Sequence, residues 1–301
     1  MALSELVHQG LIGHILTQNV DGLHRKSGVP EHKFTEFHGS GLKEVCRNCE
    51  AVYIRDFQVR NPYNKETHQT LRDCTNCGHH LYTSVVLFGQ AIRPVDKAVA
   101  MHEVSTSDFC LTLGSSLRVP PASRYPSKFL NDSGKKLAIV NLQKTYLDDK
   151  CDLRINGMCD QVMEQVMEKL RIPIPEFKIN RWLSLQVFPG VESSILQIKN
   201  YNREKVEISA IKAVELELHA AKSFDTGSVE EEPIRYKFYG DLNFLQCRFM
   251  FYGNYEEPDL VLGENDWGSL WEPLVEGREI VFHVEYTLNS RKWKIVEAKP
   301  M

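Results

Sequence analysis

The sequence lacks the long apolar runs that mark membrane-spanning proteins and the basic clusters that mark nucleic-acid-binding proteins. No stretch of the 301 residues approaches the roughly eighteen apolar residues of a membrane-spanning helix, and no charged segment followed by an apolar core opens the chain. Lys and Arg number 36 against 40 acidic residues, which gives a formal net charge of -4. Nucleic-acid binding relies on clustered Lys and Arg that neutralise phosphates. We therefore expect an intracellular protein with no membrane partner and no direct nucleic-acid binding.

The sequence has eight cysteines, and their placement argues against a disulfide framework. Of the eight, four form two Cys-x-x-Cys pairs, Cys46 with Cys49 and Cys74 with Cys77. Such pairs favour thiolate–metal chemistry in a reducing compartment over disulfides. A spacing of two lets both thiolates of a pair reach one ion, and four sulfurs complete a tetrahedral zinc site with no open position. We therefore predict one structural zinc, held by Cys46, Cys49, Cys74 and Cys77.

Other interpretations of the paired cysteines explain less. Unrelated core cysteines would have no reason to keep this spacing twice. A redox dithiol needs a neighbouring βαβ pattern and accounts for only one pair. A zinc-ribbon nucleic-acid binder needs a basic face, which the charge balance supplies at most as a local patch. The four cysteines outside the pairs are expected to be small core residues; they are Cys110, Cys151, Cys159 and Cys247.

Three apolar runs end in small or amide side chains, which suggests a ligand site at the edge of a parallel sheet. Residues 12–16 precede the polar cluster 17–21, residues 109–113 precede Gly-Ser-Ser, and residues 136–140 precede Asn-Leu-Gln. In open α/β sheets, ligands bind in the crevice outside the carboxyl ends of the strands. One such unit alone is more often an ordinary turn, but the repetition favours a doubly wound, nucleotide-binding sheet.

His38 is the side chain best suited to acid–base chemistry. It lies in Glu36-Phe37-His38-Gly39, where the glycine allows backbone or ligand to come close. An imidazole ordinarily titrates near ~6.5, so a large fraction is neutral and able to take a proton near pH 7. The alternative is a buried histidine bonded to backbone.

These residues, in their order along the chain, resemble the sirtuins, the NAD-dependent protein deacylases. The match runs through TQNVDGLH at 17–24, FHG at 37–39, the paired Cys-x-x-Cys, VLFG at 86–89, LGSSL at 113–117 and IVNLQ at 139–143. The double serine, the Asn-Leu-Gln triplet and Gly157-Met158-Cys159-Asp160 are most similar to the class IV branch. The resemblance covers residues 1–177. It implies an α/β fold, a partial Rossmann-like parallel sheet with an inserted four-cysteine zinc-binding module at about 40–85.

The resemblance also implies a reaction and a set of site residues. The acyl group of a lysine side chain would pass to ADP-ribose with release of nicotinamide, and His38 would be the general base. Substrate proteins, histones among them, would present the acylated lysine, and the protein would be nuclear or otherwise cytoplasmic. Contacts to substrate would come from Val86, Phe88, Gly89 and Val119. Contacts to NAD would come from Gln18, Asn19, Val20, Asp21, Gly114, Ser115, Ser116, Asn141, Leu142, Gln143 and Cys159.

The sequence departs from the family pattern in two places. The usual glutamate after Phe-Gly is Gln90. The glycine-rich strand-turn-helix that cradles the NAD phosphates would precede residue 1, so we expect an N-terminally truncated chain. Without that cradle the pyrophosphate loses a helix N-terminus and its N–H groups. The alternative function is therefore a catalytically inactive, zinc-stabilised protein-binding module.

Residues 178–301 show a different pattern from the first part of the chain. Apolar and polar residues alternate over six short segments, 182–188, 214–218, 236–239, 247–252, 280–286 and 293–296. This period of two, interrupted by glycine and asparagine turns, predicts a β-sandwich of roughly immunoglobulin-like size. The acidic run Glu230-Glu231-Glu232 is expected to be a solvated loop. We find no catalytic constellation here and expect an interaction module.

Overall fold

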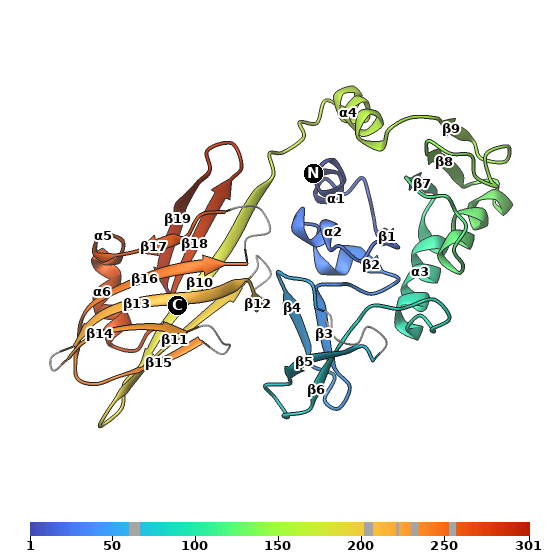
Figure 1. Ribbon diagram of the computed structural model, residues 1–301. Helices are drawn as coiled ribbons and strands as arrows, with labels where there is room; N and C mark the ends of the chain where they lie inside the picture. Colours follow the sequence, from blue (N-terminus) through green and yellow to red (C-terminus); the bar gives the residue numbers. More distant parts are fainter. Residues whose placement is uncertain (60–66, 202–206, 221–222, 230–233, 253–256) are drawn as a thin grey trace. The chain divides into compact units, whose positions relative to one another are not determined.

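The computed structural model describes residues 1–59, 67–201, 207–220, 223–229, 234–252 and 257–301, in which the chain forms two compact units (Figure 1). The first unit comprises Met1–Ser40 with Ser84–Glu176, and the second comprises Gly41–Thr83 with Phe177–Met301. The segment 41–83, which we call the cysteine module, thus groups with the C-terminal residues. The number of independently folding units and the boundary at residues 177 and 178 remain predictions. The acidic run 230–232 lies outside the described residues.

The first unit contains two small parallel sheets with helices. Strands β1 and β2 pair in parallel, and β7, β8 and β9 form a second parallel sheet in that order. The elements are α1 (Ala2–His8), β1 (Ile15–Thr17), α2 (Leu23–Lys26), η1 (Glu31–Lys33), β2 (Phe34–Glu36), α3 (Pro94–Thr106), β7 (Phe109–Leu113), η2 (Ala122–Arg124), η3 (Pro126–Asn131), β8 (Lys136–Val140), β9 (Leu153–Ile155) and α4 (Cys159–Leu170).

The predicted parallel α/β sheet is confirmed for two of the three apolar runs, whereas the first run forms β1 in a separate sheet with β2. Leu113 is paired with Val140, and Val140 with Ile155, so β7, β8 and β9 end together. The N–H of Gly114 donates to the Val140 carbonyl at 2.9 Å, and the N–H of Asn141 donates to the Ile155 carbonyl at 3.2 Å. The Gly-Ser-Ser and Asn-Leu-Gln segments therefore begin at one edge of the sheet.

One predicted element differs in its bounds from the structure. The run predicted over 12–16 becomes β1 at Ile15–Thr17, because the N–H groups of Leu11 and Ile12 bond back to the Leu6 carbonyl at the end of α1. In α4 the buried side chains are Met163 and Met167, and Val166 packs partly buried beside them.

The cysteine module is a small sheet joined to one strand of the C-terminal residues. It comprises β3 (Lys43–Cys46), β4 (Val52–Arg55), β5 (Gln69–Asp73) and β6 (His80–Thr83), in the order β12-β4-β3-β6-β5. The added strand, β12 (Ile208–Ser209), pairs with β4 in parallel. Beyond Arg55 the N–H of Asp56 bonds to the Ser209 carbonyl, which turns the chain away from β3.

The C-terminal residues form the predicted β-sandwich, with two antiparallel sheets in the orders β15-β11-β10-β18-β19 and β14-β13-β16-β17. All six predicted segments contribute to strands, and the sequence pattern missed β11, β14 and β17. The elements are β10 (Lys178–Phe188), β11 (Ser194–Tyr201), β13 (Ile211–Ala220), β14 (Ser223–Val229), β15 (Ile234–Phe238), β16 (Leu242–Phe251), β17 (Leu260–Leu262), α5 (Glu264–Trp267), η4 (Gly268–Leu270), α6 (Trp271–Val275), β18 (Ile280–Thr287) and β19 (Lys292–Pro300).

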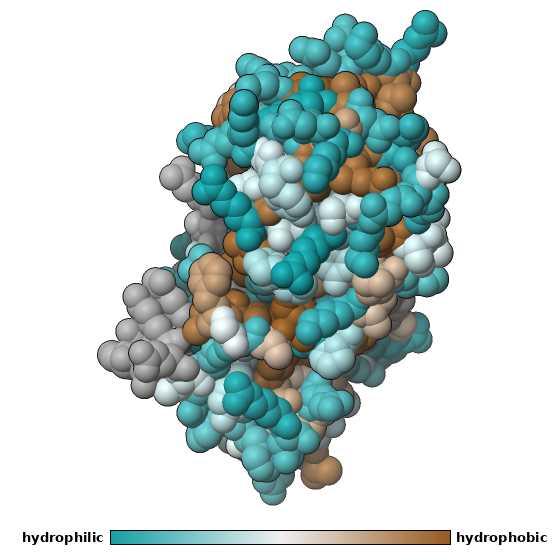
Figure 2. Space-filling view, turned by 90° about the vertical axis from the view of Figure 1, so that its right-hand side faces the viewer, coloured by the Kyte–Doolittle hydropathy of each residue, from teal (hydrophilic) through white to brown (hydrophobic). Residues whose placement is uncertain are grey.

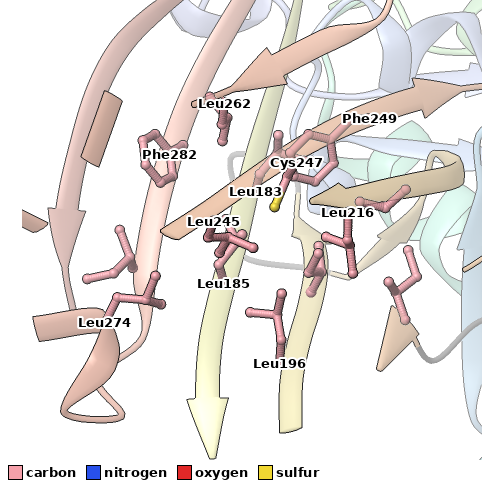
Figure 3. Packing of buried hydrophobic residues seen from close by; sticks show 14 of the residues in the cluster. Leu183, Leu185, Leu196, Leu216, Leu245, Cys247, Phe249, Leu262, Leu274 and Phe282 are labelled. Carbon is pink, nitrogen blue, oxygen red and sulfur yellow. The ribbon is translucent and has the colours of Figure 1, made fainter. Parts of the chain in front are cut away.

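Side chains from both sheets fill the core of the sandwich (Figure 3). Leu183, Leu185 and Phe282 of one sheet and Leu245 and Phe249 of the other are completely buried. Alternate residues of each strand point inward, which is why a period of two predicted these strands. Cys247 is fully buried in the same core, and burial raises the pKa of its thiol. It is a packing residue, as predicted.

Much of the surface is polar. Within the described residues, no helix is both long enough and apolar enough to cross a membrane. On the face that Figure 2 shows, hydrophobic residues reach the surface in patches between hydrophilic ones. Such patches are common on folded proteins and assign no function by themselves.

Candidate catalytic site and metal centre

His38 is held by backbone contacts that fix its ring. Its Nδ1 lies 3.2 Å from the carbonyl oxygen of Gln18, and its own carbonyl accepts the N–H of Val86 at 2.8 Å. A carbonyl oxygen can only accept, so Nδ1 carries the proton of this hydrogen bond. In the neutral ring, Nε2 is then left with its lone pair, which is the form that a general base requires.

The glycine after His38 is required by a close backbone approach. Gly39 has φ +71°, and a Cβ built on it would lie 1.9 Å from the carbonyl oxygen of Ser84. Ser40 and Ser84 then lock the two segments together, because the Ser84 hydroxyl accepts the Ser40 N–H and donates to the Ser40 carbonyl, each at 3.0 Å. His38 is thereby placed directly against residues 84–86.

A pocket of about 320 Å³ opens beside His38. We call it the His38 pocket. It brings together seven of the predicted site residues, which are Gln18, Val20, His38, Val86, Phe88, Gly89 and Val119. The side-chain amide of Gln18 donates to the Val119 carbonyl at 3.3 Å, so the end of β1 is tied to the loop after β7. A largely apolar pocket with a few convergent polar groups is the usual form of a small-molecule or side-chain site.

Residues 85–90 lie outside the strands and include a turn. Val86 bonds to the His38 carbonyl, and the chain turns at Gly89 with φ +84°. The Gln90 N–H donates to the Leu87 carbonyl at 3.1 Å, while the Gln90 side-chain oxygen accepts the Leu87 N–H at 2.9 Å. This turn leaves Phe88 92% exposed at the pocket.

The remaining predicted site residues lie outside the lining of the His38 pocket. Asn19 and Asp21 share the loop after β1, where the Asn19 N–H donates to the Thr17 hydroxyl at 3.1 Å and the Asp21 carboxylate accepts the Leu23 N–H at 3.1 Å. The other predicted residues in this group lie at the carboxyl ends of β7 and β8 or at the start of α4. They are Gly114, Ser115, Ser116, Asn141, Leu142, Gln143 and Cys159.

The strand ends offer a close approach suited to a ligand. Gly114 has φ +60°, and a Cβ there would lie 3.4 Å from Sγ of Cys159, which begins α4. Only a glycine leaves that space open and adopts this backbone without strain. The Asn141 side chain is directed to the Gln143 carbonyl at 2.9 Å, and Arg154 also donates to that carbonyl at 2.8 Å. The polar segments at this edge are therefore ordered by their own hydrogen bonds.

Seven lining residues of the His38 pocket were not predicted as site residues: Leu87, Gln90, Ala91, Ile92, Lys97, Pro120 and Pro121. Ile92 is buried just before α3, and Lys97 is exposed on the first turns of that helix. Their spacing carries no signal of a site, because a helix that follows a loop ordinarily begins with such residues. Only the folded pocket identifies them.

The four paired cysteines form the predicted metal centre. Their Sγ atoms all lie within 4.8 Å of one another, with Cys46 to Cys77 and Cys49 to Cys74 each at 3.5 Å. A tetrahedral zinc with Zn–S bonds of ~2.3 Å requires sulfurs about 3.8 Å apart, so the cluster fits that ion. The donor set has four thiolates and leaves no position for a substrate.

Each cysteine pair lies in the same kind of turn. The fourth residue after the first cysteine, Glu50 or Gly78, has positive φ and donates its N–H to that cysteine's carbonyl, at 3.0 and 2.8 Å respectively. This repeated turn aims both sulfurs of a pair at one point. The sequence predicted the ligands but not the positive φ at Glu50.

The electrostatics of the cluster also fit a cation. The Tyr53 hydroxyl, 3.1 Å from Sγ of Cys74, lowers the pKa of that thiol to about 6, helped by backbone N–H groups of residues 76 and 77. At Cys49 the Ala51 backbone lowers the pKa, but the neighbouring thiols outweigh it and raise the pKa to about 12. Thiols this close resist ionising together, and a bound dication removes that resistance.

Comparison with known proteins agrees with these observations. Residues 1–121 match the model of the Sir2 family. The NAD-dependent protein deacetylase SRT1 of Arabidopsis thaliana is 34% identical over 245 residues, which are 79% of this chain and 51% of that protein. Sirtuin-7 of Homo sapiens, an NAD-dependent protein deacetylase, is 37% identical over 191 residues, 60% of this chain and 47% of that protein. The chain thus spans about half the length of the curated relatives it matches.

A solved Sir2 structure with an inhibitor, 2'-O-acetyl-ADP-ribose and a deacetylated peptide is 31% identical. The match covers 57% of this chain and 70% of that one, with a TM-score of 0.46. The identity to the curated relatives, together with the family match, confirms the resemblance inferred from the motifs: residues 1–121 are a Sir2-family sequence.

Proposed function

We propose that the chain is an NAD-dependent protein-lysine deacylase that transfers the acyl group to ADP-ribose and releases nicotinamide. The observation that carries this proposal is the placement of His38 in a pocket with Gln18, Val119 and the 86–89 segment. A fixed imidazole with an accepting Nε2, facing an apolar pocket, fits proton abstraction from a substrate hydroxyl. The names of the relatives point to the same reaction.

In this proposal, the residues of the chain bind, orient and move a proton. The Gln18 carbonyl holds Nδ1–H of His38, and Nε2 takes the proton of a ribose hydroxyl. NAD supplies the ribose carbon that receives the acyl oxygen and the nicotinamide that leaves. Val86, Phe88, Gly89 and Val119 form the walls between which the acyl-lysine chain enters.

We place the nicotinamide and adenosine portions of NAD at the strand ends. Gln18, Asn19, Val20 and Asp21 supply amide, carboxylate and backbone groups for the carboxamide and ribose. Gly114, Ser115 and Ser116 supply small side chains beside a ribose or phosphate, and Asn141, Leu142, Gln143 and Cys159 lie on the adenosine side. The space at Gly114, next to Sγ of Cys159, is consistent with a ligand lying against the backbone there.

The wider biological assignments belong to the same proposal. Acylated lysines of proteins, histones among them, are the proposed substrates, since a solved Sir2 relative holds an acetylated peptide. A nuclear, chromatin-associated location is proposed from the similarity to the class IV branch. The zinc is structural and keeps the cysteine module folded, because its four thiolate positions are filled by protein.

The test is deacetylation of an acetyl-lysine peptide by the purified 301-residue chain, with and without NAD, followed by mass spectrometry. His38→Ala should lower kcat by about 100-fold or more, which is the range for loss of a general base. His102→Ala, on the exposed face of α3, is the matched control and should not change turnover. NAD-dependent turnover that survives in His38→Ala would contradict the mechanism. A folded, zinc-loaded chain with no turnover would favour the binding-module alternative.

A further inference from the structure

Lys97 places a positive charge at the rim of the His38 pocket. It lies on α3, one turn after the helix start, and lines the pocket together with Gln18, His38 and Val119. The residue is both exposed and part of the lining, so we take its ammonium group to be in solvent beside the pocket. A charge at that position is close to the residues that flank the substrate side chain in the pocket.

Within the described residues, nothing in the pocket neutralises this charge. None of the lining residues is Asp or Glu, and Lys97 forms no ion pair with the described part of the chain. The positions one turn away on α3 are Arg93, Pro94, Ala100 and Met101, none of which is acidic. The nearest carboxylate in sequence, Asp96, is held by two hydrogen bonds from Arg93, both 2.8 Å long.

The turn beside Lys97 carries no charge, because the residue that closes it is Gln90. Gln90 lines the same pocket, and its side-chain oxygen accepts the Leu87 N–H at 2.9 Å. A glutamate could make that hydrogen bond equally well, because a carboxylate oxygen accepts in the same way. The neutral amide therefore shapes the turn without adding a negative charge that would offset Lys97.

We infer that Lys97 selects substrates in which an acidic side chain flanks the acyl-lysine. This inference rests on the proposed function and names the substrate class of the same pocket. The ammonium group attracts the substrate carboxylate at the rim, while the acyl chain occupies the apolar interior. An exposed ion pair of this kind changes specificity modestly, by about two- to fivefold.

The test uses two fluorescent acetyl-lysine peptides that differ only in Asp or Asn on either side of the acetyl-lysine. The ratio of kcat/KM for the two peptides, and the ratio of their Kd values from fluorescence anisotropy, should favour Asp about two- to fivefold at low salt. Both ratios should approach one in about 0.5 M salt, because salt screens exposed charges.

Variants assign the preference to Lys97. Lys97→Gln should abolish it, Lys97→Arg should retain it, and Gln90→Glu should weaken it while keeping the turn. Lys169→Gln, an exposed lysine on α4 outside the pocket, is the matched control and should leave both ratios unchanged.

The outcomes separate this inference from the proposed function. Equal binding and turnover of the two peptides, or a preference for Asp that survives in Lys97→Gln, would overturn the inference even if His38-dependent turnover is observed. Asp-selective binding that depends on Lys97, with no NAD-dependent turnover, would leave it standing and count against the enzyme. Turnover of a succinyl-lysine peptide that requires Lys97, without any preference for Asp beside the acyl-lysine, would also overturn the inference. Lys97 would then recognise a carboxylate in the acyl chain and not one on a flanking residue.

Discussion

The carbonyl oxygen of Ser84 determines which residue can follow His38. Two independent constraints meet at Gly39, a left-handed backbone and a Cβ position only 1.9 Å from that oxygen. The backbone strain alone costs a non-glycine residue about 1–2 kcal/mol, and the steric overlap adds to it because both partners are backbone. The sequence predicted that this glycine allows a close approach, but only the structure identifies Ser84 as what approaches.

A comparison of two glycines separates the cost of backbone strain from the cost of steric overlap with Ser84. Gly39→Ala should lower the free energy of unfolding by about 3 kcal/mol or more and displace His38, so turnover falls with stability. Gly10→Ala is the matched control, because Gly10 has a similar φ of +73° with nothing within 4 Å of its added Cβ. It should cost only about 1 kcal/mol. Urea denaturation followed by circular dichroism measures both, and equal costs would show that Ser84 moves away easily.

Zinc content provides a second test at the level of single residues. Cys74→Ser replaces a ligand whose sulfur lies 3.5 Å from that of Cys49, so bound zinc should fall from one per chain to well below one. Cys151→Ser, a cysteine of the first unit outside the cluster, should retain full zinc. Elemental analysis of the purified variants measures the zinc content per chain. Full zinc in Cys74→Ser, or none in the wild type, would refute the assignment.

At the scale of elements, apolar runs and alternating patterns predicted strands, but they did not predict segments whose conformation depends on contacts with other parts of the chain. Strands such as β8 and β18 were predicted because their residue types match burial on a sheet. The 85–90 turn was not predicted, because its conformation depends on the His38 carbonyl and on the Gln90 side chain. Likewise, motifs predicted which residues belong to the site, while Lys97 was found only from the packing of α3.

Helix α2 anchors the strand that leads to His38. Arg25 of α2 is largely buried and bonds to Glu31 and to Glu36, the last residue of β2, with the Glu36 contacts at 3.2 and 3.4 Å. Because Glu36 precedes His38 by two residues, this contact fixes the strand end from which the imidazole projects. The desolvation that Arg25 undergoes lowers its pKa, but the two carboxylates outweigh it and raise the pKa overall. The guanidinium therefore remains charged.

A pair of arginine variants tests this anchor. Arg25→Met should cost about 3 kcal/mol, since removing one partner of a buried ion pair leaves a carboxylate without its counter-charge. Arg93→Met is the control, because Arg93 is 60% exposed and its pair with Asp96 should be worth less than about 1 kcal/mol. Thermal unfolding of the two variants gives the comparison. Similar losses in both would mean that the α2 contact is not a structural anchor.

At the largest scale, the cysteine module and the β-sandwich are joined within one compact unit. Strand β12 extends the sheet of the module, and the N–H of Asp56 donates to the Ser209 carbonyl at 3.0 Å. Arg55 bonds to the Ser209 hydroxyl and, at 2.7 Å, to the fully buried Glu44. Arg181 of β10 in turn donates to Asp56 and to Glu257, each at 2.9 Å. The position of β4 therefore depends both on the metal centre and on the sandwich.

This connection predicts that zinc removal increases hydrogen exchange in residues beyond 177. After chelation, β3 and β4 lose the cluster that holds them, and the amides around 54–56 and 208–210 should exchange hydrogen faster, since their mutual bonds open. Amides of β18, an interior strand between β10 and β19, should stay protected because the sandwich core in Figure 3 does not depend on zinc. Ser209→Ala should accelerate exchange at the same junction while zinc stays bound, since it removes the Arg55 contact and no ligand. Unchanged exchange at 208–210 in the zinc-free protein would mean that the sandwich holds β12 and β4 in place by itself, and the metal would then stabilise only the module that contains it.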